Sequence, residues 1–162
     1  MGGRRRLLAA SARDMPIAFK VRAATEADAA PIAALSRELG YPEETGTMRD
    51  RLRRILPRDD HRVYVAERGG GGVCGWIQAH SSDVLEYGFR VEITGLVVSG
   101  EMRRHGVGRS LVAQAEKWAS EISAGTIVVR SNAKRVESHE FYPALGYLPS
   151  KTQVVYRKPI VF

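Results

Sequence analysis

Apolar residues recur along the chain with two different periods, which divide it into helical and extended segments. Spacings of three and four residues mark the apolar face of an amphipathic helix, whereas alternation, or a short apolar run between turn residues, is typical of a strand. Thr25 and Asp28 form a capping-box pattern ahead of the first helix. We expect helices over residues 27–40, 47–56, 106–122 and 135–145, and strands over residues 17–22, 63–66, 73–79, 90–98, 126–129 and 154–156.

The order of these segments predicts one α/β domain over residues 15–162. This range contains no internal repeat and no interior linker, and residues 81–87 are predicted to be a polar connection. The apolar segment 126–129 is typical of a central strand that is buried on both faces. We therefore expect a mixed, mostly antiparallel sheet of six or seven strands, flanked by about four helices.

Length and composition agree with a folded domain. The 162 residues suffice for one core, and a composition of 44% hydrophobic and 27% charged residues excludes disorder and a coiled coil. No apolar stretch approaches the roughly 18 residues of a membrane span, so we expect a soluble protein without a membrane partner. Residues 1–14 contain too short an apolar run for a signal peptide, and we expect them to form a disordered extension.

Charge, cysteine and histidine limit the kinds of partner and site. The net charge is +7, but residues 1–14 supply +3 of it, and no aromatic and basic residues interleave as in nucleic-acid binders, so no nucleic-acid partner is predicted. Cys74 is the only cysteine, which precludes an internal disulfide and fits a reducing cytoplasm. The four histidines lack the spacing of metal ligands, and no metal site is predicted.

The segment 91–111 combines the features of a phosphate-binding site. An apolar strand runs into a basic loop, and Gly106 and Gly108 open the longest amphipathic helix. Glycine lets a ligand approach the backbone N–H groups, and the start of a helix favours an anion. The basic residues at this end are Arg103, Arg104 and Arg109. The pattern predicts that a pyrophosphate binds here.

Other phosphate-binding loops fit less well. A dinucleotide fingerprint requires a third glycine where Leu111 stands and an acidic residue near Arg130. A Walker loop requires a Lys-Ser/Thr pair, which the segment lacks, and no helix follows the four glycines at 69–72, which are predicted to be a hairpin turn. A tight strand-to-helix turn without a ligand remains the alternative for the glycines at 106 and 108.

Two blocks of the sequence resemble the GNAT superfamily of N-acetyltransferases. The signature of its acetyl-CoA site, Gln/Arg-x-x-Gly-x-Gly/Ala, is matched by Arg103-x-x-Gly106-x-Gly108. A second block, Asn followed by Phe-Tyr-x-x-Leu-Gly-Phe/Tyr, is matched by Asn132 and residues 141–147. The predicted order of elements agrees as well, so the resemblance spans about 145 residues.

The resemblance implies a sheet that is splayed between the strands 90–98 and 126–130, with the pantetheine arm of acetyl-CoA in the gap. The backbone of residues 96–98 would pair with the pantetheine amides, and backbone N–H groups of residues 104–109 would hold the pyrophosphate. Asn132 would contact the pantetheine or phosphate end. The cofactor-binding residues that it implies are Leu96, Val97, Val98, Arg103, Arg104, His105, Gly106, Val107, Gly108, Arg109, Ser110, Asn132, Arg135 and Tyr142.

The resemblance also implies that Tyr142 is the acid that protonates the leaving thiolate. Without the resemblance, a Phe-Tyr pair at a helix end is more typical of a packed core. Pro143 biases Tyr142 away from helical geometry, which leaves the direction of its hydroxyl open.

The base that takes the proton of the amine is expected to be Glu92, with Glu86 as the second candidate. Alternation along the strand places Glu92, Thr94, Leu96 and Val98 on one face. Glu92 could equally pair with an arginine as a structural carboxylate. His105 and His139 are also candidates, but His105 lies in the phosphate loop and His139 lies one helical turn before Tyr142.

The leading functional hypothesis is direct acetyl transfer from acetyl-CoA to the primary amine of a small molecule in a ternary complex. No nucleophile with an adjacent base is evident, so no covalent intermediate is expected. The acceptor could be an aminoglycoside, which would link the protein to antibiotic resistance, a polyamine or an amino acid-like amine. Two alternatives remain: a non-catalytic acyl-CoA sensor and a peptide or protein N-acetyltransferase. A homodimer also stays open, because dimers are frequent in the superfamily.

The choice of acceptor is assigned to the helices 27–40 and 47–56 and to the loop 81–89. The acceptor-binding candidates are Tyr41, Asp83 and Glu86, and Glu38, Glu43 and Glu44 could add to an acidic pocket for a cationic amine. A solvated surface is the alternative for each of these charges.

Overall fold

The computed structural model describes residues 16–162, so the predicted disorder of residues 1–14 lies outside the described part of the chain. The chain divides into two units, one up to Val128 and one from Val129 onward. In chain order the elements are β1 (Phe19–Ala23), η1 (Glu26–Asp28), α1 (Ala29–Glu38), α2 (Thr45–Ile55), β2 (His61–Arg68), β3 (Val73–Val84), β4 (Gly88–Val98), η2 (Gly100–Met102), α3 (Val107–Glu121), β5 (Thr126–Val129) and α4 (Val136–Ala144), where η marks a short 3-10 helix.

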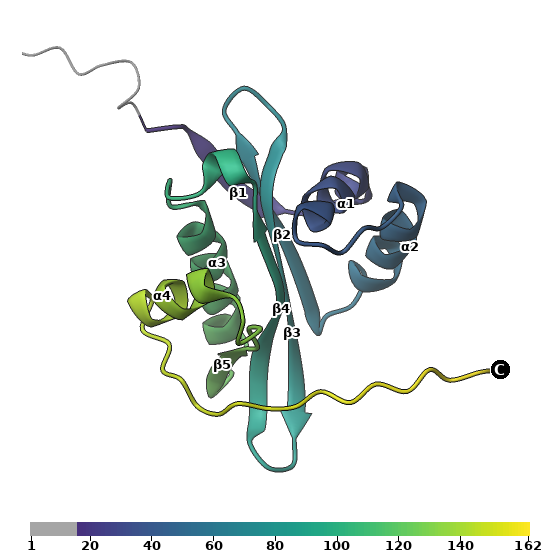
Figure 1. The fold of residues 1–162 in the computed structure, drawn as a ribbon, viewed down its shortest axis with the longest axis vertical. Helices are drawn as coiled ribbons and strands as arrows, with labels where there is room; N and C mark the ends of the chain where they lie inside the picture. Colours follow the sequence, from purple (N-terminus) through teal and green to yellow (C-terminus); the bar gives the residue numbers. More distant parts are fainter. Residues whose placement is uncertain (1–15) are drawn as a thin grey trace, which may run out of the picture. The chain divides into compact units, whose positions relative to one another are not determined.

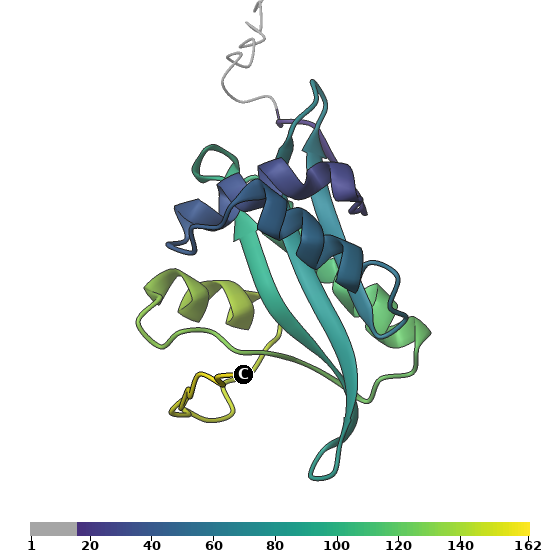
Figure 2. The same ribbon diagram turned by 90° about the vertical axis from the view of Figure 1, so that its right-hand side faces the viewer.

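A five-stranded mixed sheet with the order β1-β2-β3-β4-β5 forms the centre of the first unit. The first three neighbouring pairs are antiparallel. Helices α1 and α2 cover one face of the sheet and α3 covers the other (Figure 1). After a quarter turn, α1 and α2 lie next to each other across the strands (Figure 2). This layering leaves the end of β4 and the start of α3 connected only by a short loop.

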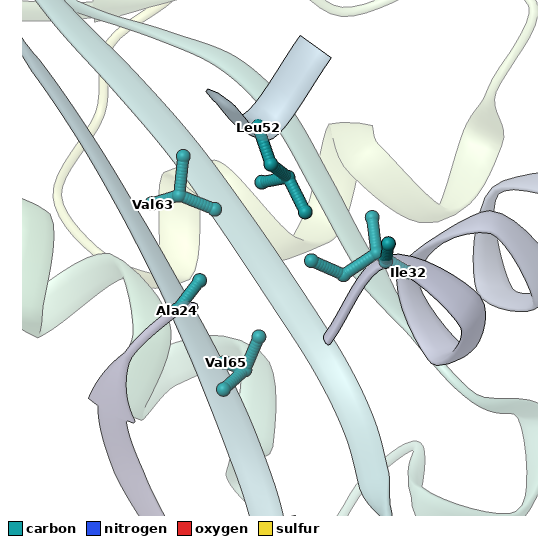
Figure 3. Close-up of a cluster of buried hydrophobic side chains, with 6 residues drawn as sticks. Ala24, Ile32, Leu52, Val63 and Val65 are labelled. Atoms are coloured by element: carbon teal, nitrogen blue, oxygen red, sulfur yellow. The ribbon is translucent and has the colours of Figure 1, made fainter. Parts of the chain in front are cut away.

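Buried side chains from strands and helices fill the layer beneath α1 and α2. Figure 3 shows Ile32 of α1 and Leu52 of α2 above Val63 and Val65 of β2, with Ala24 beside them. All five are less than a tenth exposed. Burial of apolar side chains contributes the main favourable free energy of folding, so this cluster fixes the two helices on the sheet.

On the opposite face, α3 approaches the sheet closely because Gly75 has no side chain. A Cβ atom at Gly75 would lie 3.2 Å from side-chain atoms of both Val107 and Leu111 and 3.0 Å from the carbonyl oxygen of Val97. Val107 and Leu111 are at most 1% exposed. Contact at this distance holds the first turn of α3 against β3 and β4.

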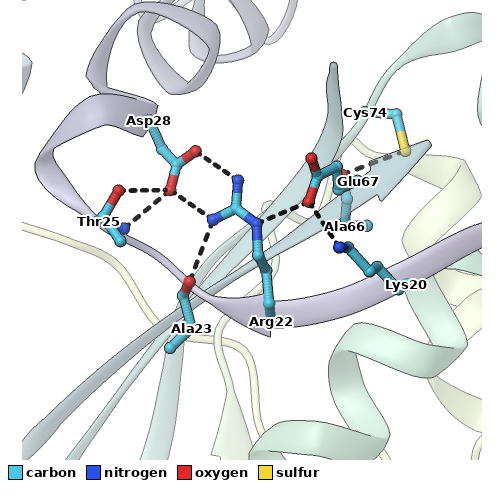
Figure 4. Close-up of polar contacts among 8 residues, drawn as sticks. All are labelled: Lys20, Arg22, Ala23, Thr25, Asp28, Ala66, Glu67 and Cys74. Atoms are coloured by element: carbon cyan, nitrogen blue, oxygen red, sulfur yellow. Dashed lines mark hydrogen bonds and ion pairs between the residues drawn. The ribbon is translucent and has the colours of Figure 1, made fainter. Parts of the chain in front are cut away.

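A partly buried ion pair joins the end of β1 to the short helix before α1 (Figure 4). Arg22 of β1 donates two hydrogen bonds to the carboxylate of Asp28, at 2.8 and 2.9 Å, and a third, from Nε, to Glu67 at 2.9 Å. The backbone N–H of Thr25 also donates to Asp28, at 2.8 Å, and completes the predicted capping box. The neighbouring Arg22 guanidinium lowers the pKa of Asp28.

Two predictions about the strands were wrong, one about their number and one about the length of β3. The described residues contain five strands rather than six or seven, because residues 149–162, including the expected strand 154–156, form neither helix nor strand. Residues 81–84 were expected in a polar connection but belong to β3, which pairs with β4 up to the turn between Val84 and Gly88. Both faces of this hairpin end are partly exposed, so its sequence lacks the alternation of a half-buried strand.

The prediction for the faces of β4 was also wrong, because β4 contains a bulge. Gln78 of β3 pairs with Gly95 and Ala79 pairs with Ile93, so Thr94 is the extra residue that no residue of β3 pairs with in the register. Its hydroxyl donates to the carbonyl of Gln78 at 3.3 Å. Beyond this extra residue, the side chains of β4 point to the faces opposite to those that simple alternation predicts. Leu96 and Val98 therefore lie on the α3 face, while Glu92 shares the face of α1 and α2 with Gly95 and Val97.

In the second unit, α4 ends in a turn that contains Pro143. The backbone N–H of Tyr147 donates to the carbonyl of Tyr142 at 3.1 Å, and Gly146, with a φ of +91°, makes the reversal at the helix end. Proline is tolerated in this last turn, so the helix continues through Tyr142. Within residues 16–162, every helix is too short or too polar to span a membrane.

Candidate acetyl-CoA site

Near the C-terminal end of β4, residues 96–98 pair with β3 along one edge of the strand. The other edge faces away from β3. On the β3 side, Leu96 pairs with Ile77, Val97 with Trp76 and Val98 with Gly75. On the other side, the backbone N–H of Gly125 donates to the carbonyl of Phe89 at 3.2 Å, which places β5 against the beginning of β4. A four-residue strand covers about 13 Å and an eleven-residue strand about 36 Å. Leu96–Val98 therefore lie beyond the reach of a β5 that starts beside Phe89.

The connection from β4 to α3 is a tight and anchored turn. Ser99 donates its backbone N–H to the carbonyl of Cys74 at 2.8 Å, and Met102 donates its own to the carbonyl of Ser99 at 3.0 Å. Met102 is 1% exposed and ties η2 to the core. The Glu101 carboxylate accepts a hydrogen bond from Arg68 at 2.8 Å, so the one acidic residue of this turn is paired with a base.

Two residues between η2 and α3 adopt the left-handed backbone region. Arg104 has a φ of +60° and Gly106 has a φ of +82°. The backbone of a residue other than glycine is strained in this region. Such strained residues cluster at binding sites. Gly106 is the N-cap of α3, and its carbonyl accepts the first helical hydrogen bond, from Ser110, at 3.0 Å.

The first turn of α3 offers donors and positive charge together. By helix geometry, the backbone N–H groups of Val107, Gly108 and Arg109 have no carbonyl four residues earlier within the helix. The turn contains no acidic side chain. The side chains around it that are exposed and basic are those of Arg103, Arg104 and Arg109, with the exposed imidazole of His105. This combination is suited to a doubly charged phosphate ester.

Glu92 lies in a buried polar cluster on β4. Its side chain is 12% exposed, and one carboxylate oxygen lies 3.7 Å from a terminal nitrogen of Arg90. The guanidinium of Arg90 in turn lies 5.2 Å from the centre of the Tyr87 ring. His80 of β3 is the pairing partner of Glu92. The structure thus gives Glu92 the arginine partner that the sequence left as its alternative role.

The acceptor-binding candidates lie at separate places in the first unit. Glu86 is exposed at the tip of the β3–β4 hairpin, and Asp83 is exposed on β3 near the same tip. Tyr41 follows α1 and is 64% exposed. Glu43 is paired with Arg51 of α2, so its charge is compensated. The remaining arginines of α2, at positions 49, 53 and 54, are exposed and make this helix basic.

In the second unit, the partly buried Tyr142 packs against two aromatic side chains. Its ring meets the rings of Phe141 and Tyr147 edge to face, at centroid distances of 5.0 and 5.6 Å. Burial raises the pKa of the Tyr142 phenol to about 12, and the charge of Arg135 opposes this only in part. The phenol therefore keeps its proton at any physiological pH.

The other residues of this unit that were predicted to belong to the site lie in α4 or just before it. Arg135 is the N-cap of α4, and its backbone N–H donates to the carbonyl of Asn132 at 2.9 Å. The Asn132 side chain accepts a hydrogen bond from the backbone N–H of Lys134 at 3.0 Å. His139 is exposed on α4.

Two residues of the first unit contribute to the site but were not singled out from the sequence. Arg90 lies two residues from Glu92 on the same strand, and this spacing, which puts both on one face, is a signal that sequence reasoning could have used. Gly75 gave no signal of its own, because its role depends on α3, which comes thirty residues later in the chain.

Comparison with known proteins identifies the family. Residues 29–147 match the model of the acetyltransferase (GNAT) family. An aminoalkylphosphonate N-acetyltransferase of Salmonella typhimurium is 33% identical over 138 residues, which cover 84% of this chain and 88% of that protein. An aminoglycoside N(6')-acetyltransferase type 1 of Serratia marcescens is 24% identical over 129 residues, covering 75% and 84% of the two chains.

The fold is shared with solved structures. The aminoglycoside N-acetyltransferase AAC(6')-Iy in complex with CoA superimposes with a TM-score of 0.79 at 17% identity, over 91% of this chain and 99% of that one. The family match covers most of the chain and includes both the Gly106 loop and Tyr142. The chain therefore belongs to the GNAT family of acetyltransferases and is an N-acetyltransferase.

Proposed function

We propose that the protein transfers the acetyl group of acetyl-CoA to the primary amine of a small molecule in a ternary complex. The observation that carries this proposal is the first turn of α3. Its backbone N–H groups, its left-handed N-cap Gly106 and its exposed arginines provide donors and charge for a pyrophosphate. The names of the relatives support an amine as the acceptor.

Acetyl-CoA, when bound, supplies an acetyl thioester, whose carbonyl carbon is open to attack by an amine. The side of Leu96–Val98 that faces away from β3 would hold the pantetheine amides as an added strand, because β5 covers only the beginning of β4. The Val98 carbonyl on this side accepts a hydrogen bond from Arg103 at 3.5 Å. The predicted splay of the sheet is supported by the same difference in strand length. Asn132 and Arg135 are assigned to the pantetheine and phosphate end.

Two side chains handle the protons of the transfer. As the amine nitrogen forms its bond to the acetyl carbon, the carbon–sulfur bond breaks and the amine loses a proton. We assign the acceptance of this proton to Glu92, directly or through water, with Arg90 holding the carboxylate in place. Tyr142 gives its phenolic proton to the departing sulfur, and its raised pKa keeps that proton available.

The acceptor is assigned to the class of small primary amines. The two named relatives act on an aminoglycoside and on an aminoalkylphosphonate, which share the amine and differ in the charge of the rest of the molecule. Tyr41, Asp83 and Glu86 are the residues that we assign to acceptor recognition. The buried thiol of Cys74 fits a reducing compartment, and we place the reaction in the cytoplasm. An aminoglycoside acceptor would make the protein a resistance enzyme.

The test is release of free thiol from acetyl-CoA in the presence of single acceptors. The panel contains an aminoglycoside, an aminoalkylphosphonate, a polyamine, an amino acid and a peptide amine, and mass spectrometry confirms the acetylated product. We expect turnover on a small amine that falls in Tyr142→Phe. Thermal protection by CoA without turnover on any amine would favour the sensor function, and turnover on the peptide alone would favour a peptide N-acetyltransferase.

A further inference from the structure

Three titratable side chains lie in one row across strands β2, β3 and β4 of the first unit. His61 of β2 pairs with His80 of β3, and His80 pairs with Glu92 of β4. Residues that pair directly in an antiparallel sheet project from the same face, with their Cβ atoms about 4.5–5.5 Å apart. The row therefore starts at the carboxylate that we assign as the base and continues through two imidazoles.

The two imidazole rings of this row pack against each other. The ring centroids of His61 and His80 are 5.5 Å apart and the ring planes differ by 23°, so the rings are stacked. A neutral imidazole has one nitrogen that donates and one that accepts, which lets it take up a proton and pass one on. At this separation the transfer between the rings occurs directly or through one water molecule.

The surface end of the row is held by Asp60 and Arg58. Nδ1 of His61 lies 2.9 Å from a carboxylate oxygen of Asp60, and Arg58 donates two hydrogen bonds to the same carboxylate, at 2.9 and 2.8 Å. The hydrogen bonds from Arg58 and His61 lower the pKa of Asp60, so this carboxylate stays ionised and only accepts. Nδ1 of His61 therefore carries a proton, and Nε2 is the nitrogen that can take up another.

Exposure to solvent increases along the row from the base to the surface. The side chain of Glu92 is 12% exposed, that of His61 is 18% exposed and that of Asp60 is 45% exposed. A base that is mostly buried takes one proton from the amine in each turnover and has to lose it before the next. Arg90, 3.7 Å from Glu92, offers no route for this proton, because a guanidinium stays protonated.

We propose that His80 and His61 form a proton relay that returns Glu92 to its ionised form after each acetyl transfer. This inference rests on the proposed function, because it requires Glu92 to take up the proton of the amine. The carboxyl group of Glu92 gives its proton to a ring nitrogen of His80, His80 gives a proton to Nε2 of His61, and His61 gives one to water. Each step breaks one O–H or N–H bond and forms another, so no further reactant is needed.

The test uses His80→Gln, with Ser82→Ala as the matched control. Glutamine keeps a hydrogen-bonding side chain at position 80 but does not take up a proton, and Ser82 lies on the same face of β3 without a titratable group. With the panel amine that gives the highest kcat/KM, His80→Gln should lower kcat by about 100-fold, the lower end for a group that transfers protons. The KM for acetyl-CoA should not change, and Ser82→Ala should keep the kcat of the unaltered protein.

Two further readouts separate a proton relay from a structural role of the histidines. Imidazole in the buffer can accept the proton in place of the missing ring, so the kcat of His80→Gln should rise with imidazole concentration. The ratio of kcat in H2O to kcat in D2O should also be larger in this variant, because proton transfer then limits the rate. His61→Gln should show both effects and provides a second variant at the surface end of the row. Thermal protection by CoA reports whether each variant keeps its fold.

The possible outcomes distinguish failure of the relay from failure of the proposed function. An unchanged kcat in His80→Gln, while the unaltered protein turns over, would overturn the relay alone. A lowered kcat that imidazole does not restore, with an unchanged solvent isotope effect, would also overturn it, since the ring would then act only in packing. If the unaltered protein acetylates none of the amines, the proposed function fails and the relay fails with it.

Discussion

The suitability of Tyr142 for its proposed role as an acid comes from burial rather than from a charged neighbour. Burial raises the pKa of its phenol to about 12, so the proton is present across the range of assay pH. We predict that Tyr142→Phe lowers kcat by about 100- to 1000-fold, the usual range for loss of a general acid. The KM for acetyl-CoA should change little, because phenylalanine preserves the ring contacts. Steady-state thiol release measures both constants.

The raised pKa of Tyr142 also gives a pH dependence with a definite sign. An acid is active while it is protonated, so kcat should hold through the ordinary tyrosine pKa of about 10 and decline only toward 12. The Phe variant should lack this decline. A decline of the unaltered enzyme centred near 10, absent from the variant, would show that burial does not control this group.

The N-cap of α3 gives a second prediction at the scale of one residue. Gly106 has a φ of +82°, which an alanine adopts only with strain, whereas nothing lies within 4 Å of a Cβ built there. We predict that Gly106→Ala lowers the free energy of unfolding by about 1 to 2 kcal/mol through backbone strain alone, and weakens CoA binding. Urea unfolding and calorimetry measure the two effects.

Gly46→Ala is the matched control for this substitution. Gly46 lies inside α2, also with no atom within 4 Å, and its φ is not positive. Alanine is the better helix former, so stability should rise or stay level and CoA binding should not change. An equal loss of CoA affinity in both variants would show that the effect at Gly106 does not arise from its backbone conformation.

At the scale of elements, the joint between β1 and α1 depends on the Arg22–Asp28 ion pair. Asp28 is 4% exposed and accepts hydrogen bonds from Arg22 and Thr25. We predict that Asp28→Asn costs about 3 kcal/mol of unfolding free energy, the lower end for a broken buried pair, because the Arg22 side chain is one third exposed.

The cost of Asp28→Asn should depend on pH in a way that its lowered pKa dictates. A carboxylate whose pKa is lower in the folded protein stabilises the fold fully above its ordinary value of 3.8, and this contribution is lost as the pH falls through the folded value. Urea unfolding at neutral pH and near pH 3 should therefore show a smaller difference between the two proteins at the acid pH. If the difference in unfolding free energy between the two proteins did not change with pH, the stabilising role of the ionised Asp28 would be contradicted.

Sequence periodicity located the elements of the fold well where one face is buried. The four helices and the strands β1 to β5 lie near the predicted segments, because each has a regular apolar stripe or run. The end of the β3–β4 hairpin was missed because residues 81–84 are exposed and polar. The bulge at Thr94 was missed because a bulge is defined by the partner strand, and single-strand alternation cannot register it.

Some parts of the candidate site could be predicted from the sequence and others could not. The loop from Arg103 to Gly108 was evident from glycine and arginine spacing, and the left-handed conformation of Gly106 agrees with that reading. The positive φ of Arg104 was not evident, since arginine seldom adopts it. The face of Glu92 depended on the bulge and was predicted wrongly, although its pairing with Arg90 is a two-residue spacing visible in the sequence.

At the scale of the whole molecule, the sheet brings parts of the proposed acyl-donor site together from separate stretches of sequence. Core packing beneath α1 and α2 fixes β2 and β3, and Gly75 lets α3 start directly against β3. The same sheet leaves the end of β4 unpaired beyond β5. The fold therefore places the free edge at the end of β4 and the N-terminus of α3 at the two ends of one short loop.

The central claim is that this helix N-terminus holds the pyrophosphate of acetyl-CoA, and the most direct measurement compares two ligands. Calorimetric titration with CoA and with pantetheine, which lacks the pyrophosphate and nucleotide, isolates the contribution of that end. We predict that CoA binds at least about 100-fold more tightly and that added salt reduces the difference, because the interaction is partly ionic. Equal affinities for the two ligands, or no binding of CoA, would contradict the account.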